Sequence, residues 1–407
     1  MGCSFPLRST FLSMVRALTI AALLATTILT ASCGAASSSP APTVKVIAAG
    51  LDQPKKLTIA PNGELIVALS GDGKAPSSCT DGNQRSCLDH SGAIDEVSTG
   101  GRVTTLESGL VSISSGPSDP QATGPVEARL VDGKLQVLFQ NTTINAKTGR
   151  EIYGTGGALL SDLVAFSRTG HAHAIMARFG PFEARYNPDH GRGTDVHYGD
   201  DFAIDSDPYS FVPYRGGYAV ADAGANDLLF VSRTGKVSLL AVFPTIREYA
   251  KAGTYGKSQK HAIEAQAQAV PTAVAVGPDG ALYVGELGGI PYGVGTSDVY
   301  RVLPGHRPTV YARGLTAIGD IAFDREGRLL VLEIDRRGLD DPGLNDGRPT
   351  SGAIIRVTGD GRESVVASTG LDFPTALAVG QDGYIYVSND GTSSAGSGHG
   401  GEIVRVK

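Results

Sequence analysis

The sequence predicts an all-β fold built from six repeated four-stranded units, and three observations lead to this prediction. The 407-residue chain contains 54 Gly and 22 Pro, an excess of turn-forming residues that suits short strands and would interrupt long helices. Residues 270–284 recur as residues 373–387, and each copy places an Asp-Gly turn between two runs of alternating apolar residues. Weaker copies of the same frame begin near residues 51, 125, 208 and 318, which makes six units.

Each unit repeats the same order of strands and turns. A tight turn containing Gly joins the first strand to the second at 62–63, 132–133, 216–217, 279–280, 326–327 and 382–383. A third strand follows at 93–97, 162–166, 227–231, 298–302, 353–357 and 402–406. Another Gly turn then leads to a short fourth strand, such as 236–241. Four antiparallel strands per unit, repeated six times, are typical of a six-bladed β-propeller.

The two ends of the repeat region complement each other. The sixth unit stops after its third strand, at Val406, whereas an additional strand at 44–48 precedes the first unit. We expect this N-terminal strand to pair with the last blade and close the ring, because the pairing covers an edge that would otherwise be exposed. On this interpretation, residues 43–407 form one propeller domain.

The N-terminal segment has the features of an export signal. Two Arg residues precede an uncharged, mostly apolar run at 17–31, which is too short for a membrane-spanning helix of about 20 residues. Small residues directly before Cys33 resemble the bacterial lipobox. We expect a lipoprotein signal peptide at 1–32, a lipid on Cys33 and a flexible tether at 33–42. The protein is then extracytoplasmic and anchored to the bacterial cell membrane; the alternative is an ordinary signal peptide and a secreted protein.

Two further cysteines predict a covalent link, and the net charge limits which partners the protein can bind. Cys79 and Cys87 form an even pair, which predicts a disulfide in an exported protein. A zinc site is the weaker alternative, because two thiolates do not complete one. The formal charge of −6 argues against nucleic acid as a partner and leaves the lipid as the contact with the membrane. We expect a monomer.

Long insertions mark one face of the predicted ring. In a propeller, the loops between second and third strands and the connections between blades emerge on one face, here called the loop face. The other turns emerge on the opposite face, here called the turn face. The long insertions all belong to the loop face, at 70–92, 140–160, 179–207, 243–269 and 334–351. We expect the functional site there, because long loops in compact domains are often functional.

Acidic and amide residues gather near the axis on the loop face. They lie near the starts of first strands or the ends of second strands: Asp52, Asp207, Asp320, Asp222, Glu286, Glu333, Asp390, Asn226 and Asn389. We expect Asp222, Glu286 and Glu333 to converge around one axial opening. Such oxygens suit Ca²⁺ or the hydroxyl groups of a polar ligand. The alternative is that these residues cap turns at strand ends.

The longest insertion also contains two histidines among acidic residues. His190 and His197 are candidate ligands of a transition metal, although their spacing in a loop does not establish a site. No GxSxG nucleophile motif and no CxxCH haem motif occurs in the sequence, so no catalytic residue is assigned. The sequence assigns no cofactor, and Ca²⁺ is a candidate.

Several stretches resemble one family of secreted propellers, the ScyD/ScyE family, which is named after proteins of the cyanobacterial scytonemin cluster. The similar stretches are 221–228, 270–280, 284–287, 187–189 and 205–209. The Gly turns are shared with NHL-type propellers in general. The sequence departs from the family in a longer insertion at 190–204 and in Asp207, where the family has Asn. The resemblance implies export and a propeller, and it implies no settled reaction.

Two classes of function follow from these features. The first is a non-catalytic binding or scaffolding module for a small polar ligand or an extracytoplasmic protein. The second is a propeller enzyme, either a metal-dependent hydrolase or lactonase or a sugar dehydrogenase, that uses the axial acidic cluster. No residue stands out as the base that a lactonase needs, and an acidic rim opposes an anionic quinone cofactor. The sequence therefore favours binding.

Overall fold

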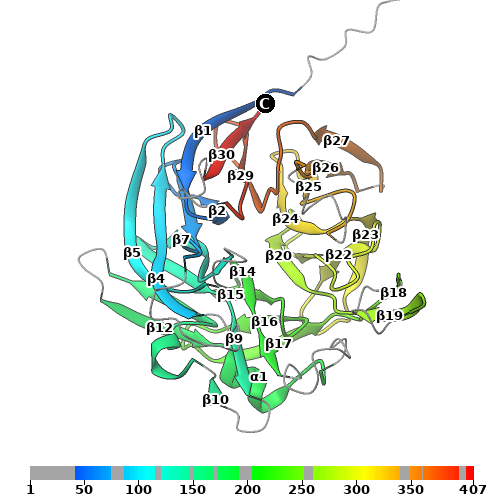
Figure 1. Ribbon diagram of the computed structural model, residues 1–407, viewed down its shortest axis with the longest axis horizontal. Coiled ribbons are helices and arrows are strands. Elements are labelled where there is room, and N and C mark those ends of the chain that lie inside the picture. The colour runs from blue at the N-terminus through cyan, green and yellow to red at the C-terminus, as the bar shows by residue number, and fades with distance from the viewer. Residues whose placement is uncertain are drawn as a thin grey trace, which may run out of the picture. The chain divides into compact units, whose positions relative to one another are not determined.

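The computed structural model describes residues 42–74, 87–114, 121–145, 150–151, 153–167, 172–191, 204–251, 260–339, 348–359, 361–393 and 400–407. Within these residues, six antiparallel sheets are arranged as blades around a central axis (Figure 1). The predicted six-bladed β-propeller is therefore confirmed. In the described part of the chain, no helix has the length and hydrophobicity needed to cross a membrane.

The blades follow the order of the sequence. Blade 1 contains β2 (Pro54–Ile59), β3 (Leu65–Leu69), β4 (Cys87–Val97) and β5 (Val103–Ser114), with the short β6 (Ala122–Thr123) at its edge. Blade 2 contains β7 (Pro125–Val131), β8 (Lys134–Phe139), β11 (Asp162–Phe166) and β12 (His173–Arg178). Blade 3 contains β14 (Pro208–Tyr214), β15 (Gly217–Asp222), β16 (Asp227–Val231) and β17 (Val237–Val242).

The second half of the ring has the same composition. Blade 4 contains β20 (Pro271–Val276), β21 (Leu282–Glu286), β22 (Ser297–Val302) and β23 (Thr309–Leu315). Blade 5 contains β24 (Ile318–Phe323), β25 (Leu329–Glu333), β26 (Ala353–Val357) and β27 (Glu363–Ala367). Blade 6 contains β28 (Ala376–Val379), β29 (Ile385–Asn389), β30 (Gly401–Val406) and β1 (Val44–Leu51).

The first strand of each blade lies beside the axis. β2, β7, β14, β20, β24 and β28 each contact the corresponding strands of the two neighbouring blades. In blades 1 to 5 a register shift, or β-bulge, occurs near the start of this strand, for example between Ile318 and Asp320. A bulge redirects the side chains that follow it. The polar residues after the bulges, such as Glu127 and Asp320, line the axial cavity described below.

Hydrophobic side chains fill the spaces between blades. Along β21, Leu282 and Val284 pack against blade 3, whereas Tyr283, which lies between them, packs against blade 5. Successive side chains of a strand point to opposite faces of the sheet. A blade that is covered on both faces therefore needs a continuous apolar run, which explains stretches such as Leu65–Leu69.

The ring is closed by the two ends of the propeller. β1 runs antiparallel to β30, with Val44 opposite Val406 and Ala48 opposite Ile403 (Figure 1). Ala48 and Leu51 are buried in a cluster with residues of blades 1 and 6. The prediction that the N-terminal strand completes the last blade is confirmed, and the strand extends three residues beyond its predicted end.

Smaller elements arise from the long insertions. β9 (Thr142–Asn145), β10 (Arg150–Glu151) and β13 (Asp205–Ser206) form one small sheet, and β18 (Ile246–Ala250) pairs with β19 (Ile263–Ala267). The described residues also contain a 3-10 turn, η1 (Gly154–Gly157), and a short helix, α1 (Gly180–Tyr186). The helix contacts β9 and β13, so parts of two insertions meet beside blade 3.

Candidate functional site

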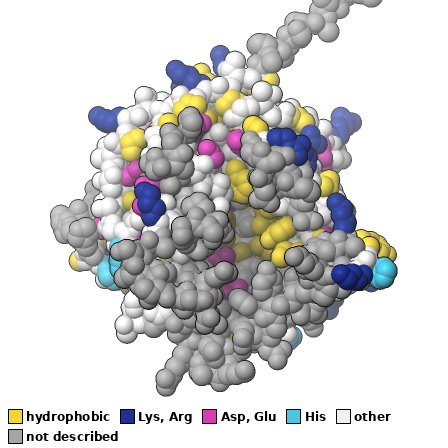
Figure 2. All heavy atoms as spheres, viewed as in Figure 1, with side chains coloured by type: hydrophobic (Ala, Val, Ile, Leu, Met, Phe, Trp, Pro, Cys, Tyr) yellow, Lys and Arg dark blue, Asp and Glu magenta, His cyan; other side chains and the backbone are white. Residues whose placement is uncertain are grey.

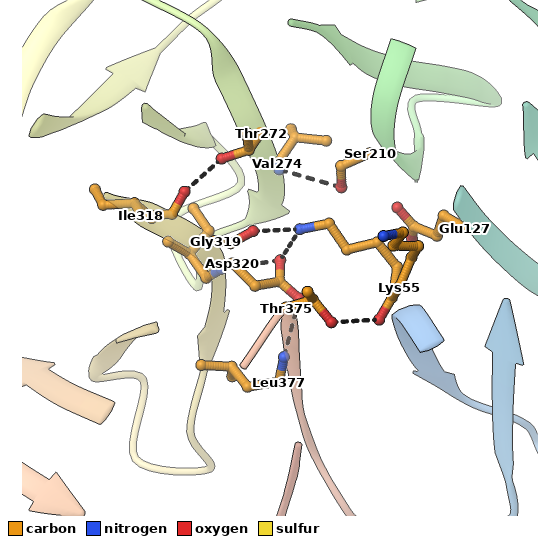
Figure 3. Close-up of polar contacts among 12 residues, drawn as sticks. Lys55, Glu127, Ser210, Thr272, Val274, Ile318, Gly319, Asp320, Thr375 and Leu377 are labelled. Carbon is orange, nitrogen blue, oxygen red and sulfur yellow. Dashed lines mark hydrogen bonds and ion pairs between the residues drawn. The ribbon is translucent and has the colours of Figure 1, made fainter. Parts of the chain in front are cut away.

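The axis is crossed by a buried lysine. Lys56 of β2 reaches blade 5, where Nζ donates hydrogen bonds to the carbonyl oxygen of Gly319 (2.7 Å) and to Oδ1 of Asp320 (2.8 Å) (Figure 3). The Lys56 side chain is 2% exposed, and Nζ lies 5.5 Å from the centre of the Tyr209 ring. Oδ2 of Asp320 accepts a hydrogen bond from the Leu377 N–H of blade 6. The predicted residue Asp320 therefore belongs to a contact that joins several blades.

A second ion pair lies in the wall of the same cavity. Arg129 contacts Oε1 of Glu127 at 2.5 Å, and Oε2 of Glu127 accepts a hydrogen bond from the Phe211 N–H (2.9 Å). The cavity has a volume of about 380 Å³, and its other walls are mostly apolar. Figure 2 shows acidic side chains and hydrophobic side chains near each other in the hollow at the centre of the view. Both carboxylates that line the described cavity, Glu127 and Asp320, have a cationic partner.

A larger group of carboxylates lies beside blade 3. Asp222 ends β15 and Asp227 begins β16, and the two residues are directly opposite in the sheet, so their side chains project from the same face. Four acidic residues from α1, β13 and the adjoining segments interact electrostatically with this pair or with one another. We name the whole group the blade 3 acid cluster; it consists of Glu183, Asp189, Asp205, Asp207, Asp222 and Asp227.

Part of this cluster caps turns. The Asp222 carboxylate accepts hydrogen bonds from the Ser206 hydroxyl (2.6 Å), the Asp207 N–H (2.7 Å) and the Ala225 N–H (3.2 Å). Asn226 has a positive φ of 53°, and its Nδ2 donates to Oδ2 of Asp189 (2.9 Å). The capping alternative therefore describes Asp222 and Asn226 well.

Asp227 has a different environment. Its side chain is 0% exposed, and neither carboxylate oxygen has a hydrogen-bond partner among the described residues. Oε2 of Glu183 and Oδ1 of Asp205 are also buried without a partner there. Burial, followed by the charges of Asp222, Glu183 and Asp189, raises the pKa of Asp227 well above its usual value. An ionised carboxylate in such a position is costly unless it is neutralised.

The other acids of the cluster are shifted in the same direction. Burial and the charges of neighbouring carboxylates raise the pKa of Glu183 to about 9, that of Asp205 to about 8 and that of Asp207 to about 7. Burial raises the pKa of Asp222 to about 6, against the effect of its hydrogen bonds. Because like charges this close repel one another, the cluster needs bound protons or a bound cation near neutral pH.

The donor atoms of the cluster suit a hard divalent cation, because carboxylate oxygens are the ligands that Ca²⁺ prefers. Among the described residues, however, no group of three or more His, Cys, Asp or Glu side chains is already arranged to hold a metal ion. Binding therefore requires some of these side chains to move towards the ion.

Glu286 and Glu333 lie in other blades and have other surroundings. Glu286 ends β21, where burial and the charge of Asp298 raise its pKa well above the usual value. Glu333 ends β25, accepts a hydrogen bond from the Thr316 N–H (2.8 Å) and forms an ion pair with Arg336 (3.1 Å). Among the described residues, Asp222, Glu286 and Glu333 do not form a group that could hold a metal ion.

The remaining acidic and amide candidates have local roles. Asn389 accepts a hydrogen bond from the Asp372 N–H (2.8 Å) at the end of β29. Asp390, which has a φ of 54°, accepts a hydrogen bond from the Ser393 hydroxyl (2.6 Å). Asp52 follows β1, and its charge contributes to the raised pKa of Asp95. The structure does not bring these three residues into the blade 3 acid cluster.

The histidines and cysteines are only partly described. His190 follows α1, is exposed, and donates its backbone N–H to the carbonyl oxygen of Asn187 (3.0 Å). His197 lies outside the described residues. Cys87, the first residue of β4, is disulfide-bonded. Its predicted partner, Cys79, lies outside the described residues.

Sequence reasoning missed Lys56 and four members of the blade 3 acid cluster: Glu183, Asp189, Asp205 and Asp227. One periodic signal was available for Asp227, because acidic residues recur at or near the start of the third strand, as in Asp162 and Asp298. For Lys56, the available signal was a charged residue within a first strand, because most other blades have only uncharged residues there.

No protein-family model matches the sequence. No curated protein matches it either. Several solved structures resemble it. One is a PQQ-bound aldose sugar dehydrogenase from Streptomyces coelicolor, which is 13% identical in sequence. The match covers 90% of this chain and 98% of that chain, with a TM-score of 0.48. A candidate gluconolactonase has 11% identity, 91% and 93% coverage and a TM-score of 0.47. A catalytically inactive virginiamycin B lyase from Staphylococcus aureus has 12% identity, 90% and 99% coverage and a TM-score of 0.42. At these values the matches carry no argument about function.

Proposed function

We propose that the protein is an exported, lipid-anchored propeller that binds a small polar ligand or an extracytoplasmic protein on its loop face. A cation of the Ca²⁺ class, held by the blade 3 acid cluster, takes part in that binding. The observation that carries the proposal is Asp227: a fully buried carboxylate, without a hydrogen bond among the described residues, directly opposite Asp222.

A divalent cation would offset the charges that make this arrangement costly. Asp227, Glu183 and Asp205 have buried oxygens without partners in the described structure, so these residues are the ones that would hold it. A bound Ca²⁺ supplies coordination positions for ligand hydroxyl or carbonyl oxygens, since it takes six to eight oxygen ligands. Extracellular calcium modules bind with Kd values of about 10⁻⁴ to 10⁻³ M, so we expect an affinity in that range.

The geometry supports binding over the enzyme alternative. That alternative places a catalytic metal or a quinone at an axial acidic cluster. In the described part of the axial cavity, Asp320 is paired with Lys56 and Glu127 with Arg129. Carboxylates that are already paired with cations have less charge to offer a metal.

The cation part of the proposal is tested by thermal unfolding in EDTA and in millimolar CaCl₂. Calcium should raise the Tm by mass action if it binds the folded state. Asp227→Asn should remove most of this increase and should melt higher than the parent in EDTA, because one repulsive charge is gone. Glu286→Gln is the matched control: it removes another buried acid at a strand end outside the cluster, and it should keep the full response.

Two results would overturn the cation proposal. The first is that the parent gives the same melting curve in EDTA and in CaCl₂ and copurifies with no metal. The second is that Asp227→Asn and Glu286→Gln respond to calcium equally.

The anchoring part rests on the lipobox-like sequence before Cys33, which lies outside the described residues. Cys33→Ser should release the protein into the medium or leave it unprocessed. Fractionation of cells and mass measurement of the product check this. A Cys33→Ser product of mature size that stays with the membrane fraction contradicts lipid anchoring.

A further inference from the structure

A groove lies between blades 2 and 3 on the turn face. Its walls include Lys134, Gln136 and Met176 from blade 2 and Arg215, Tyr218 and Arg233 from blade 3. The groove has a volume of about 850 Å³, which is within the usual range for small-molecule sites of about 300–1,000 Å³. We call it the blade 2–3 groove.

The groove is basic in a protein whose net charge is −6. Lys134, Arg215 and Arg233 line it, against one acidic residue, Asp132. Among the described residues, none of the three cations forms an ion pair: Nε of Arg233 donates a hydrogen bond to the carbonyl oxygen of Gly216 (2.8 Å). The Arg215 guanidinium lies 5.2 Å from the centre of the Tyr214 ring. The charges of the groove are therefore available to an anion.

A buried amide adds a second, independent observation. Gln136 is 4% exposed, and its Nε2 donates a hydrogen bond to the Tyr218 hydroxyl (2.7 Å). Its Oε1 is buried and has no donor among the described residues. A buried amide oxygen without a donor costs about 1–3 kcal/mol, so its presence points to a missing partner. A ligand hydroxyl group or a bound water would supply that hydrogen bond.

We propose that the blade 2–3 groove binds a small hydroxylated organic anion of the sugar-acid class. The carboxylate of the ligand lies near Arg215, Arg233 and Lys134, where its charge is attracted and hydrogen-bonded by guanidinium and ammonium groups. One ligand hydroxyl donates to Oε1 of Gln136. The partly buried Tyr218 and Met176 offer apolar surface to the sugar ring.

This proposal is independent of the proposed cation site. The blade 3 acid cluster lies at the strand ends that face the loop side, whereas the groove is lined by residues of the tight turns at the opposite ends of the same strands. A failure at one site leaves the other unaffected, and the two tests use different probes.

The test is isothermal titration calorimetry of the purified protein with D-glucuronate. D-glucose and acetate are the matched probes, since one lacks the carboxylate and the other lacks the hydroxyl groups. Glucuronate should bind more tightly than either, and its affinity should decrease as salt is raised. The double variant Arg215→Gln, Arg233→Gln should weaken binding about tenfold or more, which corresponds to at least one charge-assisted contact.

Two further variants separate the contributions of the site. Gln136→Leu should reduce the preference for glucuronate over acetate, because the hydroxyl contact is lost. Lys236→Gln is the control, because Lys236 is exposed on the same turn of blade 3 but does not line the groove, and it should bind as the parent does. The proposal is overturned if glucuronate shows no binding at millimolar concentration, if acetate binds as tightly, or if the double Arg variant binds unchanged.

Discussion

A buried lysine, Lys56, lines the axial cavity of this propeller. Lys56 is one of the largest fully buried side chains, and its ammonium contacts Asp320, which lies 264 residues further along the chain. A buried pair of this kind adds little net stability compared with apolar residues, but removing one partner leaves a buried charge uncompensated. Burial raises the pKa of Asp320, and Lys56 opposes that shift.

Lys56→Met should therefore destabilise the protein by about 3–5 kcal/mol at neutral pH, measured by urea unfolding. The double variant Lys56→Met, Asp320→Asn should recover most of this loss, since neither charge of the pair remains. Lys45→Met, on an exposed position of β1, should change the free energy of unfolding by about 0.5 kcal/mol or less. The interpretation is wrong if the double variant is no more stable than Lys56→Met alone.

Contacts at this scale were the part that sequence could not predict. The alternation of apolar residues predicts which face of a strand is buried, but it does not tell which distant residue a buried Lys or Asp meets. The expected axial convergence paired Asp222 with Glu286 and Glu333, whereas Asp222 is grouped with Asp227, its neighbour across one hairpin. Local pairing within a blade thus brings these two carboxylates together more than nearness to the axis does.

At the scale of elements, the repeat predicted the strands closely and the insertions poorly. The expected third strands 162–166, 227–231 and 353–357 coincide with β11, β16 and β26. In contrast, β4 begins at Cys87, inside a segment that was expected to be a loop, and α1 was not predicted. Repeated hairpins have strong local signals, whereas α1 spans seven residues and depends on contacts with β9 and β13.

The closing strand β1 gives a matched pair of tests at this scale. Leu51 is 4% exposed and packs between blades, so Leu51→Ala should cost about 2–5 kcal/mol. Val46, on the same strand, is 46% exposed, and Val46→Ala should cost much less, about 0.5 kcal/mol. Urea unfolding of both variants checks this, and equal losses would contradict a ring closed by packing of β1. Deleting residues 43–49 should lower the Tm strongly.

At the scale of the whole molecule, acidic and basic groups lie at opposite ends of the strands of blade 3. The blade 3 acid cluster lies at the loop end of its strands, and the basic blade 2–3 groove lies at the turn end. The net charge of −6 hides this separation, because it sums over both ends. The pH dependence of stability should therefore be set mainly by the acid cluster, where five neighbouring buried carboxylates have raised pKa values.

In EDTA, the free energy of unfolding should decrease as the pH rises from about 5 to about 9. The folded-state pKa values lie at about 6 for Asp222, 7 for Asp207, 8 for Asp205 and 9 for Glu183, all above those of the unfolded chain, near 4. The folded state therefore holds more protons, and stability is lost as the pH rises through these values. Urea unfolding at constant ionic strength measures the slope; a stability that rises with pH in EDTA would be the opposite of this expectation.

Saturating calcium should flatten the same profile. A bound divalent cation favours the ionised carboxylates, so it competes with the protons and lowers the folded-state pKa values. If the profiles with and without calcium are parallel, the protons and the cation do not share a site.

The pairing of β1 with β30 also has a consequence for how the protein is made. A ribosome synthesises β1 first and its partner last, and at about 5–20 residues per second roughly 20–70 s pass between them. During that time, β1 has no native neighbour in the last blade, and once β29 has been made its outer side is an open edge until β30 follows. An unpaired strand edge invites pairing with other chains. Translation products that stop before Gly401 should therefore be degraded or aggregate even though five blades are complete.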